Sequence, residues 1–577
     1  MAVSTTLRPI RRATVTALTA VVLGLLLSSC HPHCSEHVRP RTAVRLEVRE
    51  VDLGPSDYQV HVSPNLRRAA CVIGHFDGPK RVVVDGEPGN PYRRVGVVTF
   101  SPDSERFSYV AEVDDGKRVI IDGEEGPVYD DVTGPTWSPD SKRFAYAARR
   151  GDEQFAVVDG RQGPAHGRVD GSYHHGPGFS PDSRHVYYAV KEGDKWRVVV
   201  DGDPGPPYDE VHVSYAAWSP DSQHFFYTAW RGDTALLVLD GTEYPVCEHR
   251  ASHFVADGHV PAEFAGSIAP PFMCTFSPDS TRLVYTLSRA VRWPFFVRGI
   301  STREYLRETV VTRHVDGSVE VGRPYELIYN TDFSPDGRRL GYVAERNGRM
   351  VAVVDGQEDT PYDWIEGGYL TFSPDSEHVA YAAEENGRWF AIADGVEGPS
   401  YDLVWDVLFS HDSRHVAYRT QENGLSRAVI DGREGRAYPK VGFIGPSAWS
   451  PDGRRVAYAA SPGGDRWLVV VDGREGPVYD DIHGGPVFTP DSRHVVWVAL
   501  RNEEWFAVVD GTETRGYDHF SYRHGDPSYV AFDGPDRLRA IGERDGRVYR
   551  LEIRIVEAGE AERTCPAQPD PTNGGTR

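Results

Sequence analysis

The chain is dominated by one phrase of about forty residues that returns roughly twelve times. A full copy contains an apolar or aromatic tripeptide, Ser-Pro-Asp followed by Ser or Gly, a strand-like segment, an Asp-Gly pair and a closing Tyr-Asp, as from Thr99 to Val132. Self-similarity at a fixed period indicates one supersecondary unit stacked many times. A period near forty with several short strands per unit is typical of propeller blades.

The register of the copies can be counted from the residue that precedes proline. Most copies carry serine there, at Ser63, Ser101, Ser138, Ser180, Ser219, Ser277, Ser334, Ser373 and Ser450. His411 and Thr489 mark variant copies, and Gly534 marks a degraded last one. The two longest spacings flank the sixth copy, so the pattern indicates an interruption in the middle of the chain.

The copy around Ser373 predicts four short antiparallel strands, at Leu370 to Phe372, His378 to Ala383, Arg388 to Ala393 and Pro399 to Val404. The Pro-Asp pair after the serine suits the first turn, because proline presets φ at the turn position it occupies. Asn-Gly and Asp-Gly pairs supply the positive φ that two-residue hairpins need. Each copy is therefore expected to fold as a four-stranded sheet.

These copies resemble the Ser-Pro-Asp-Gly repeats of the TolB-type, WD-like propellers. The segment from Phe333 to Gly356, FSPDGRRLGYVAERNGRMVAVVDG, fits that pattern closely, and the resemblance covers about residues 43 to 556. It implies an all-β propeller fold. The chain lacks the separate α/β domain expected in front of the propeller of TolB itself.

The ends and the middle of the array predict how the blades close. The last copy lacks a fourth strand, and the orphan strand Val44 to Val51 is expected to complete it. An incomplete blade would expose an edge strand whose unpaired backbone groups could bind other chains. Two six-bladed rings, at 43–305 and 306–556, would account for both this shortage and the irregular sixth copy. A single ring of about twelve blades is the alternative, although natural rings usually have 4 to 8 blades.

The two ends of the chain are expected to lie outside the propeller, as an export signal at the N-terminus and a disordered tail at the C-terminus. Residues 1–29 carry basic residues, a short apolar stretch and Leu-Ser-Ser before Cys30, which resembles a bacterial lipobox. That resemblance implies cleavage before Cys30, lipid on its thiol and a protein exported to the cell envelope and anchored to a membrane. Residues 30–42 are expected to be a tether and 557–577 a disordered tail.

Composition and motifs narrow the class of function. The formal charge of −22 disfavours nucleic acid and leaves basic partners open. Six cysteines are too few for a disulfide-stapled scaffold, and a Cys247–Cys274 pair is left open against two free thiols. No Gly-x-Ser-x-Gly, His-Glu-x-x-His or phosphate-loop motif occurs, so the sequence predicts no cofactor, no metal and no catalysis of those kinds.

The candidate site residues are acids and histidines in the repeat connections. Six recurring Tyr-Asp pairs would place their carboxylates in a ring on one face, where they could attract cations or basic peptides: Asp130, Asp209, Asp363, Asp402, Asp480 and Asp518. The alternative is that each Asp accepts a hydrogen bond from a turn and each Tyr packs between blades. His174 and His175 are weaker candidates, because adjacent residues of a strand point to opposite faces.

The sequence therefore predicts a non-catalytic, lipid-anchored propeller scaffold that binds a protein or peptide partner. The alternative is a carbohydrate-binding protein, or a hydrolytic or lyase enzyme, with its site in a propeller funnel, where side chains from different blades converge without a linear motif. The oligomeric state is left open.

Overall fold

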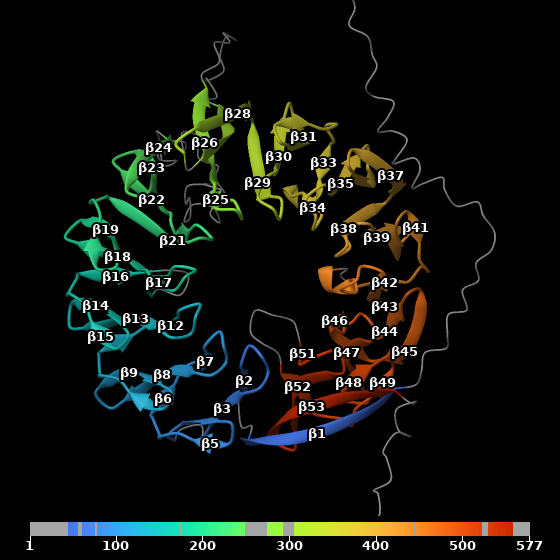
Figure 1. Ribbon diagram of the computed structural model, residues 1–577, viewed down its shortest axis with the longest axis horizontal. Helices are drawn as coiled ribbons and strands as arrows, with labels where there is room; N and C mark the ends of the chain where they lie inside the picture. Colours follow the sequence, from blue (N-terminus) through green and yellow to red (C-terminus); the bar gives the residue numbers. More distant parts are fainter. Residues whose placement is uncertain are drawn as a thin grey trace, which may run out of the picture. The chain divides into compact units, whose positions relative to one another are not determined.

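The computed structural model describes residues 44–55, 60–74, 78–171, 176–247, 274–291, 305–314, 316–442, 445–521 and 529–557. Val44–Val556 forms one compact unit in which twelve antiparallel sheets follow one another around a ring (Figure 1). The all-β propeller of about twelve four-stranded blades is thus confirmed. In each blade the first strand lies nearest the ring axis and the fourth lies outermost (Figure 1).

Blades 1 to 6 follow one another along the first half of the chain. Blades 1 to 3 comprise β2 (Val60–Val62), β3 (Ala69–Ile73), β4 (Arg81–Val84), β5 (Glu87–Pro88); β6 (Arg94–Val95), β7 (Thr99–Phe100), β8 (Phe107–Val113), β9 (Gly116–Ile121), β10 (Glu124–Glu125); and β11 (Asp131–Val132), β12 (Thr136–Trp137), β13 (Phe144–Arg150), β14 (Glu153–Val158), β15 (Arg161–Gln162). Blades 4 to 6 comprise β16 (Arg168–Asp170), β17 (Gly178–Phe179), β18 (Val186–Glu192), β19 (Lys195–Val200), β20 (Asp203–Pro204); β21 (Glu210–Trp218), β22 (Phe225–Arg231), β23 (Thr234–Leu239), β24 (Thr242–Cys247); and β25 (Cys274–Phe276), β26 (Arg282–Val291), β27 (Tyr305–His314), β28 (Val319–Tyr325).

Blades 7 to 12 repeat the plan and include two short 3-10 turns. Blades 7 to 9 comprise β29 (Leu327–Phe333), β30 (Leu340–Arg346), β31 (Arg349–Val354), β32 (Gln357–Glu358); β33 (Trp364–Ile365), η2 (Glu366–Gly368), β34 (Thr371–Phe372), β35 (Val379–Glu385), β36 (Arg388–Ala393), β37 (Val396–Tyr401); and β38 (Leu403–Phe409), β39 (Val416–Glu422), β40 (Leu425–Ile430), β41 (Arg433–Glu434). Blades 10 to 12 comprise β42 (Lys440–Val441), η3 (Pro446–Ala448), β43 (Ala457–Gly463), β44 (Arg466–Val471), β45 (Arg474–Tyr479); β46 (Asp481–Phe488), β47 (Val495–Arg501), β48 (Glu504–Val509), β49 (Thr512–Glu513); and β50 (His519–Ser521), β51 (Ala531–Phe532), β52 (Arg537–Arg544), β53 (Arg547–Glu557), with β1 (Val44–Pro55).

The fourth strand of a blade begins earlier than the sequence predicts. In blade 8 it is β37, which starts at Val396 directly after the Asp394-Gly395 hairpin and ends at Tyr401. The predicted strand, Pro399 to Val404, was wrong because Leu403 already begins β38 of the next blade. The Tyr-Asp pair therefore lies at the junction between two blades rather than inside one strand.

The prediction for ring closure by the orphan strand is confirmed. β1 pairs with β53 and completes the sheet of blade 12 as its outermost strand (Figure 1). Glu50 of β1 accepts a hydrogen bond from the Tyr517 hydroxyl, as Glu513 accepts one from Tyr479 in the blade before. β1 thus replaces the fourth strand in both pairing and side-chain contacts.

The preferred arrangement of two six-bladed rings was wrong, and the single ring is the one found. Residue 305, the expected boundary, lies inside a sheet, where Tyr305 of β27 pairs with Val291 of β26. Blade 6 contacts blade 7, since the Arg282 guanidinium lies 4.9 Å from the Phe333 ring centroid. The long spacings are thus insertions before and within blade 6, and no gap separates it from blade 7.

Blades 12 and 1 meet in the same way. Arg539 Nη1 donates to the carbonyl oxygen of Asn65 at 2.6 Å, across 474 positions of sequence. The apolar core is divided into layers between neighbouring blades, as where Val469 of β44 and Val495 of β47 share one buried cluster. A blade is therefore stable only against its neighbours, as expected for stacked repeats.

Candidate functional site

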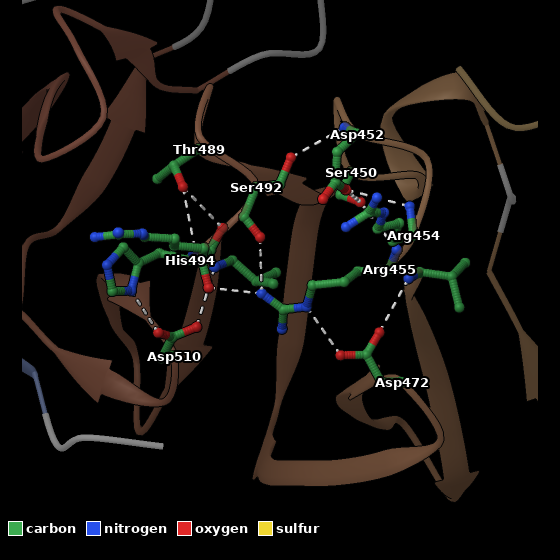
Figure 2. Close-up of polar contacts among 12 residues, drawn as sticks. Ser450, Asp452, Arg454, Arg455, Asp472, Thr489, Ser492, His494 and Asp510 are labelled. Carbon is green, nitrogen blue, oxygen red and sulfur yellow. Dashed lines mark hydrogen bonds and ion pairs between the residues drawn. The ribbon is translucent and has the colours of Figure 1, made fainter. Parts of the chain in front are cut away.

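The Ser-Pro-Asp turns hold adjacent blades together (Figure 2). The Ser450 hydroxyl donates to Asp452 Oδ1 at 2.6 Å and accepts the backbone N–H of Arg455 at 2.9 Å. The Asp452 N–H donates to Ser492 Oγ of the next blade at 3.0 Å. The Ser450 hydrogen bond is the first cause of a lowered pKa at Asp452. Ser450, Asp452, Arg455 and Ser492 therefore form hydrogen bonds within the fold.

The same backbone link crosses eight of the seams between blades. Its donors and acceptors are Asn65 to Ser104, Asp103 to Ser141, Asp140 to Ser183, Asp182 to Ser222, Asp221 to Ser280, Asp336 to Ser376, Asp375 to Ser413, and Asp452 to Ser492. Arg455 adds a second link, because its guanidinium joins Asp472 at 3.0 Å and the Ser492 carbonyl at 3.0 Å (Figure 2). The most repeated polar residues are thus explained by structure.

The six Tyr-Asp aspartates lie at the other ends of the strands, beside the hairpins that join second and third strands. Each accepts a backbone N–H from that hairpin of the next blade: Asp130 from Gly151, Asp209 from Gly232, Asp363 from Asn386, Asp402 from Asn423, Asp480 from Asn502 and Asp518 from Asp545. The donor to acceptor distances run from 2.6 to 2.9 Å. Each carboxylate serves a separate seam, and its contact with a ligand stays a prediction.

The tyrosines of these pairs are buried between blades. Tyr129 is 3% exposed, and its hydroxyl donates to Gln162 of the next blade at 3.1 Å. Burial raises the pKa of this phenol. The tyrosines of the Tyr-Asp pairs therefore pack between blades, as the alternative interpretation of these pairs expects.

The remaining candidate residues fall largely outside the described ranges. Cys30, His174 and His175 lie outside them, as does the side chain of Cys247. Cys274 has a free thiol whose pKa is raised well above its ordinary value by burial. Within the described ranges there is no cluster of three or more metal-ligating side chains, and no helix there has the length and apolar character to cross a membrane.

The repeat pattern is interrupted in blades 8 and 9, next to blade 7. We call this region the inner arc; it comprises residues on or beside the first strands of blades 7 to 9, with Arg419 from the second strand of blade 9: Tyr329, Glu366, Gly367, Gly368, Tyr369, Trp405, Asp406 and Arg419. The 3-10 turn η2 interrupts the inner strand of blade 8, and Gly367 and Gly368 have φ of 59° and 65°. Asp406 in β38 also has a positive φ, 55°, at a break in strand register. Positive φ at a non-glycine residue is uncommon and marks a locally constrained backbone.

The two glycines are required by the aromatic rings beside them. A Cβ on Gly367 would lie 2.2 Å from the Tyr369 ring, and one on Gly368 would lie 2.8 Å from Tyr329. Tyr369 is 40% exposed although it is large and largely apolar. The glycines thus seat two tyrosine rings against the backbone of η2.

Two acids and one arginine meet beside these rings. The side chain of Asp406 is 10% exposed, and its Oδ2 lies 3.1 Å from Arg419 Nε. The Arg419 guanidinium also lies 5.0 Å from the Trp405 ring centroid. Burial, and next the charge of Asp406, raise the pKa of Glu366 to about 7. One arginine is therefore shared by two carboxyl groups, which leaves an excess negative charge when Glu366 ionises.

Sequence reasoning missed the inner arc, although two signals were present. The segment between Asp363 and Ser373 is two residues longer than that between Asp402 and Ser410, and it contains Glu366-Gly367-Gly368. The second signal is Asp406, which stands four residues before the turn serine, where the copies of Ser101 and Ser138 carry Val97 and Gly134. Both signals are departures from the repeat, and a pattern defined by recurring residues does not reveal them.

No family model matches the chain, and no curated protein is significantly similar to it. Among solved structures, TolB from Acinetobacter baumannii is 16% identical over 50% of this chain and 77% of its own, with a TM-score of 0.19. The β-propeller domain of the Trilobed protease from Pyrococcus furiosus is 13% identical over 49% of this chain and 95% of its own, with a TM-score of 0.25. The assignment of the fold rests on the sheet topology above.

Proposed function

We propose that the protein is a non-catalytic binding scaffold of the bacterial cell envelope, exported and anchored to a membrane through lipid on Cys30. The ring would hold a protein or peptide partner, with a cationic segment seated at the inner arc. The observation that carries this proposal is the pair of carboxyl groups, Glu366 and Asp406, gathered around the single cation of Arg419 beside an exposed aromatic ring.

The chemistry of the inner arc suits a lysine or arginine side chain. With Glu366 ionised, two carboxylates face one guanidinium, so a second cation would balance the charge. Tyr369 and Trp405 offer ring faces, and a cation near an aromatic face gains roughly 0.5–2 kcal/mol depending on its hydration. The net charge of −22 would also speed the approach of a basic partner at low salt.

Binding should depend on pH through Glu366. Burial raises the pKa of this carboxyl to about 7, so it is largely protonated and neutral below that pH. A cation prefers the ionised form, and its binding would release a proton. The affinity for a basic peptide is therefore expected to rise between pH 6 and pH 8.

Calorimetry with an Arg- and Lys-containing peptide tests the proposal. Glu366→Gln should weaken binding about tenfold at pH 8 and remove the dependence on pH. Asp130→Asn is the matched control, because it removes one carboxylate from a seam and leaves the inner arc intact. Equal losses in the two variants would point to the Tyr-Asp aspartates, and no binding of basic peptides at all would refute the proposal.

The lipid anchor is tested separately. Cys30→Ser should release the protein from the membrane fraction of the bacterial host and abolish labelling by radioactive palmitate. Retention of the variant in the membrane fraction would refute anchoring through Cys30. It would leave the peptide-binding result untouched.

A second candidate function is the binding or cleavage of carbohydrate at the same arc. It is favoured by Glu366, since a carboxyl group with a pKa of about 7 can remain protonated and act as an acid beside an ionised partner. Glycan turnover that is lost in Glu366→Gln, without binding of basic peptides, would replace the scaffold by this function.

A further inference from the structure

A second departure from the repeat lies at the residue that begins the first strand of a blade. In blades 2 to 5 and 10 to 12 this residue is charged or a histidine: Arg94, Asp131, Arg168, Glu210, Lys440, Asp481 and His519. Blades 7, 8 and 9 carry Leu327, Trp364 and Leu403 instead. All three pair with the last residue but one of the second strand, as the residues of blades 2 and 3 do, so the positions are equivalent.

These three apolar side chains are accessible and lie on consecutive blades. Trp364 is 46% exposed, Leu327 is 38% exposed and Leu403 is partly exposed. Single exposed apolar residues are ordinary, but a contiguous group of them marks an interaction surface. Blade 8 shares a buried cluster with each of its two neighbours, and packed sheets lie about 10 Å apart. We call Leu327, Trp364 and Leu403 the apolar row.

The apolar row continues the inner arc along the same strands. Ile365, between Trp364 and Glu366, is extended, with φ of −121° and ψ of 127°, and its side chain is fully buried. Alternate residues of an extended segment point to the same side, so Trp364 and Glu366 both lie on the side away from Ile365. Ile328 and Val404 are the buried residues at this place in blades 7 and 9. Each residue of the apolar row therefore has an inner-arc residue beside it, about 7 Å along the strand.

Acidic side chains stand next to the apolar row. The residue opposite Leu327 on the second strand is Glu345, and the residue opposite Trp364 is Glu384. Directly opposite residues of an antiparallel pair have neighbouring side chains on one face of the sheet. Glu384 Oε1 accepts the N–H of Gly387 at 2.6 Å, which holds this carboxylate at the hairpin. Apolar and negatively charged groups thus adjoin, and they complement a segment in which apolar and basic side chains adjoin.

We propose that the apolar row binds a leucine or aromatic side chain of the same partner whose lysine or arginine enters the inner arc. The recognised segment is extended and carries its apolar residue two positions from its basic residue, because two residues of an extended chain also span about 7 Å. This inference rests on the peptide-binding proposal and specifies the sequence of the partner.

Calorimetry with the full chain at pH 8 tests the inference with three blocked peptides. They are Gly-Gly-Leu-Gly-Lys-Gly-Gly, the same peptide with glycine in place of leucine, and Gly-Gly-Gly-Leu-Lys-Gly-Gly. The first should bind about tenfold more tightly than the second, a difference of about 1.4 kcal/mol that is close to the gain from burying a leucine side chain. The third should gain less than the first, since adjacent residues of an extended chain point to opposite sides.

Two variants locate the gain. Trp364→Gln should remove the tenfold advantage of the first peptide and leave the affinity for the second unchanged. The fold accepts polar residues at this position, as blades 2 to 5 show. Val396→Gln is the matched control, because Val396 is also exposed, at 44%, but begins β37, the outermost strand of the same blade. It should keep the full advantage.

The outcomes separate this inference from the proposed function. Binding of the lysine peptides with no advantage from leucine, or an advantage that persists in Trp364→Gln, would refute the inference and leave the cation site in place. If no basic peptide bound, both proposals would fail. Sedimentation velocity examines the other occupant: a dimer that dissociates in Trp364→Gln but not in Val396→Gln would show that a second copy covers the apolar row, and it would also overturn the inference. The peptide comparison on the unaltered protein holds even if a variant misfolds.

Discussion

Replacing Ser450 by alanine should loosen the seam between blades 10 and 11. The hydroxyl of Ser450 is fully buried, donates to the Asp452 carboxylate and accepts the N–H of Arg455 (Figure 2). A hydrogen bond to a charged group contributes roughly 1.5–3 kcal/mol, and a buried N–H left without a partner costs roughly 1–3 kcal/mol. We expect Ser450→Ala to reduce the free energy of local opening by about 3 kcal/mol.

Hydrogen exchange under native conditions is the suitable assay, because a ring of this size need not unfold in one cooperative step. A loss of about 3 kcal/mol corresponds to roughly hundredfold faster exchange of the amides in β43 and β44. Ser450→Thr is the matched control, since Thr489 occupies this position in blade 11. The Thr489 hydroxyl donates to Asp491 at 2.6 Å and accepts the His494 N–H at 3.0 Å.

Two results would refute the reasoning on Ser450. The first is an alanine variant that exchanges at the parent rate, since the two hydrogen bonds would then contribute nothing measurable. The second is a threonine variant that exchanges as fast as the alanine variant, since the hydroxyl would then not be the group that matters.

Three further predictions follow from charged groups in the ring. The carboxylates of the Ser-Pro-Asp turns, such as Asp452, have lowered pKa values, so their contribution to folding stability is present above the ordinary pKa of 3.8 and is lost as pH falls through the folded pKa. The thermal melting midpoint should therefore fall from pH 5 to pH 3, and it should fall less in Ser450→Ala. Glu366 has a raised pKa, so its ionisation lowers the stability of the folded state as pH rises from the ordinary pKa of 4.5 to about 7. After discounting for solvent exposure, urea unfolding of Glu366→Gln should show a free energy of unfolding about 1.5 kcal/mol higher than that of the parent at pH 8 and little changed at pH 4. An equal effect at both pH values would contradict the raised pKa. The Glu50 carboxylate is 16% exposed and binds Arg544 at 3.2 Å and the Tyr517 hydroxyl. Glu50→Gln should therefore destabilise the attachment of β1 by about 2 kcal/mol and speed tryptic cleavage at Arg45 and Arg49. Unchanged cleavage would show that other contacts hold the strand.

Local turn chemistry explains why the blades could be predicted from sequence. The Asp472-Gly473 pair has φ of 51° and 76°, as a tight hairpin requires, and the same pair recurs in most copies. The serine turn depends only on residues within five positions of Ser450. Such features need no knowledge of distant segments. The variant copy shows the same point, since Ser410 keeps the turn although His411 replaces proline.

The number of rings could not be predicted because it depends on contacts between distant segments. Whether blade 1 meets blade 6 or blade 12 is decided at one seam, where Arg539 reaches Asn65. Every blade offers almost the same surface there, so the repeat pattern favours neither neighbour. The inner arc was missed for a related reason: Glu366 interacts with Asp406 of the next blade, and the sequence does not show that these two residues lie together.

The central claim is one closed ring in which β1 completes blade 12. Electron cryomicroscopy of the purified protein, with class averages viewed down the ring axis, tests it most directly. We expect a single ring of twelve blades around one opening. Two smaller rings of six blades, or an open arc with blades 1 and 12 apart, would contradict the account.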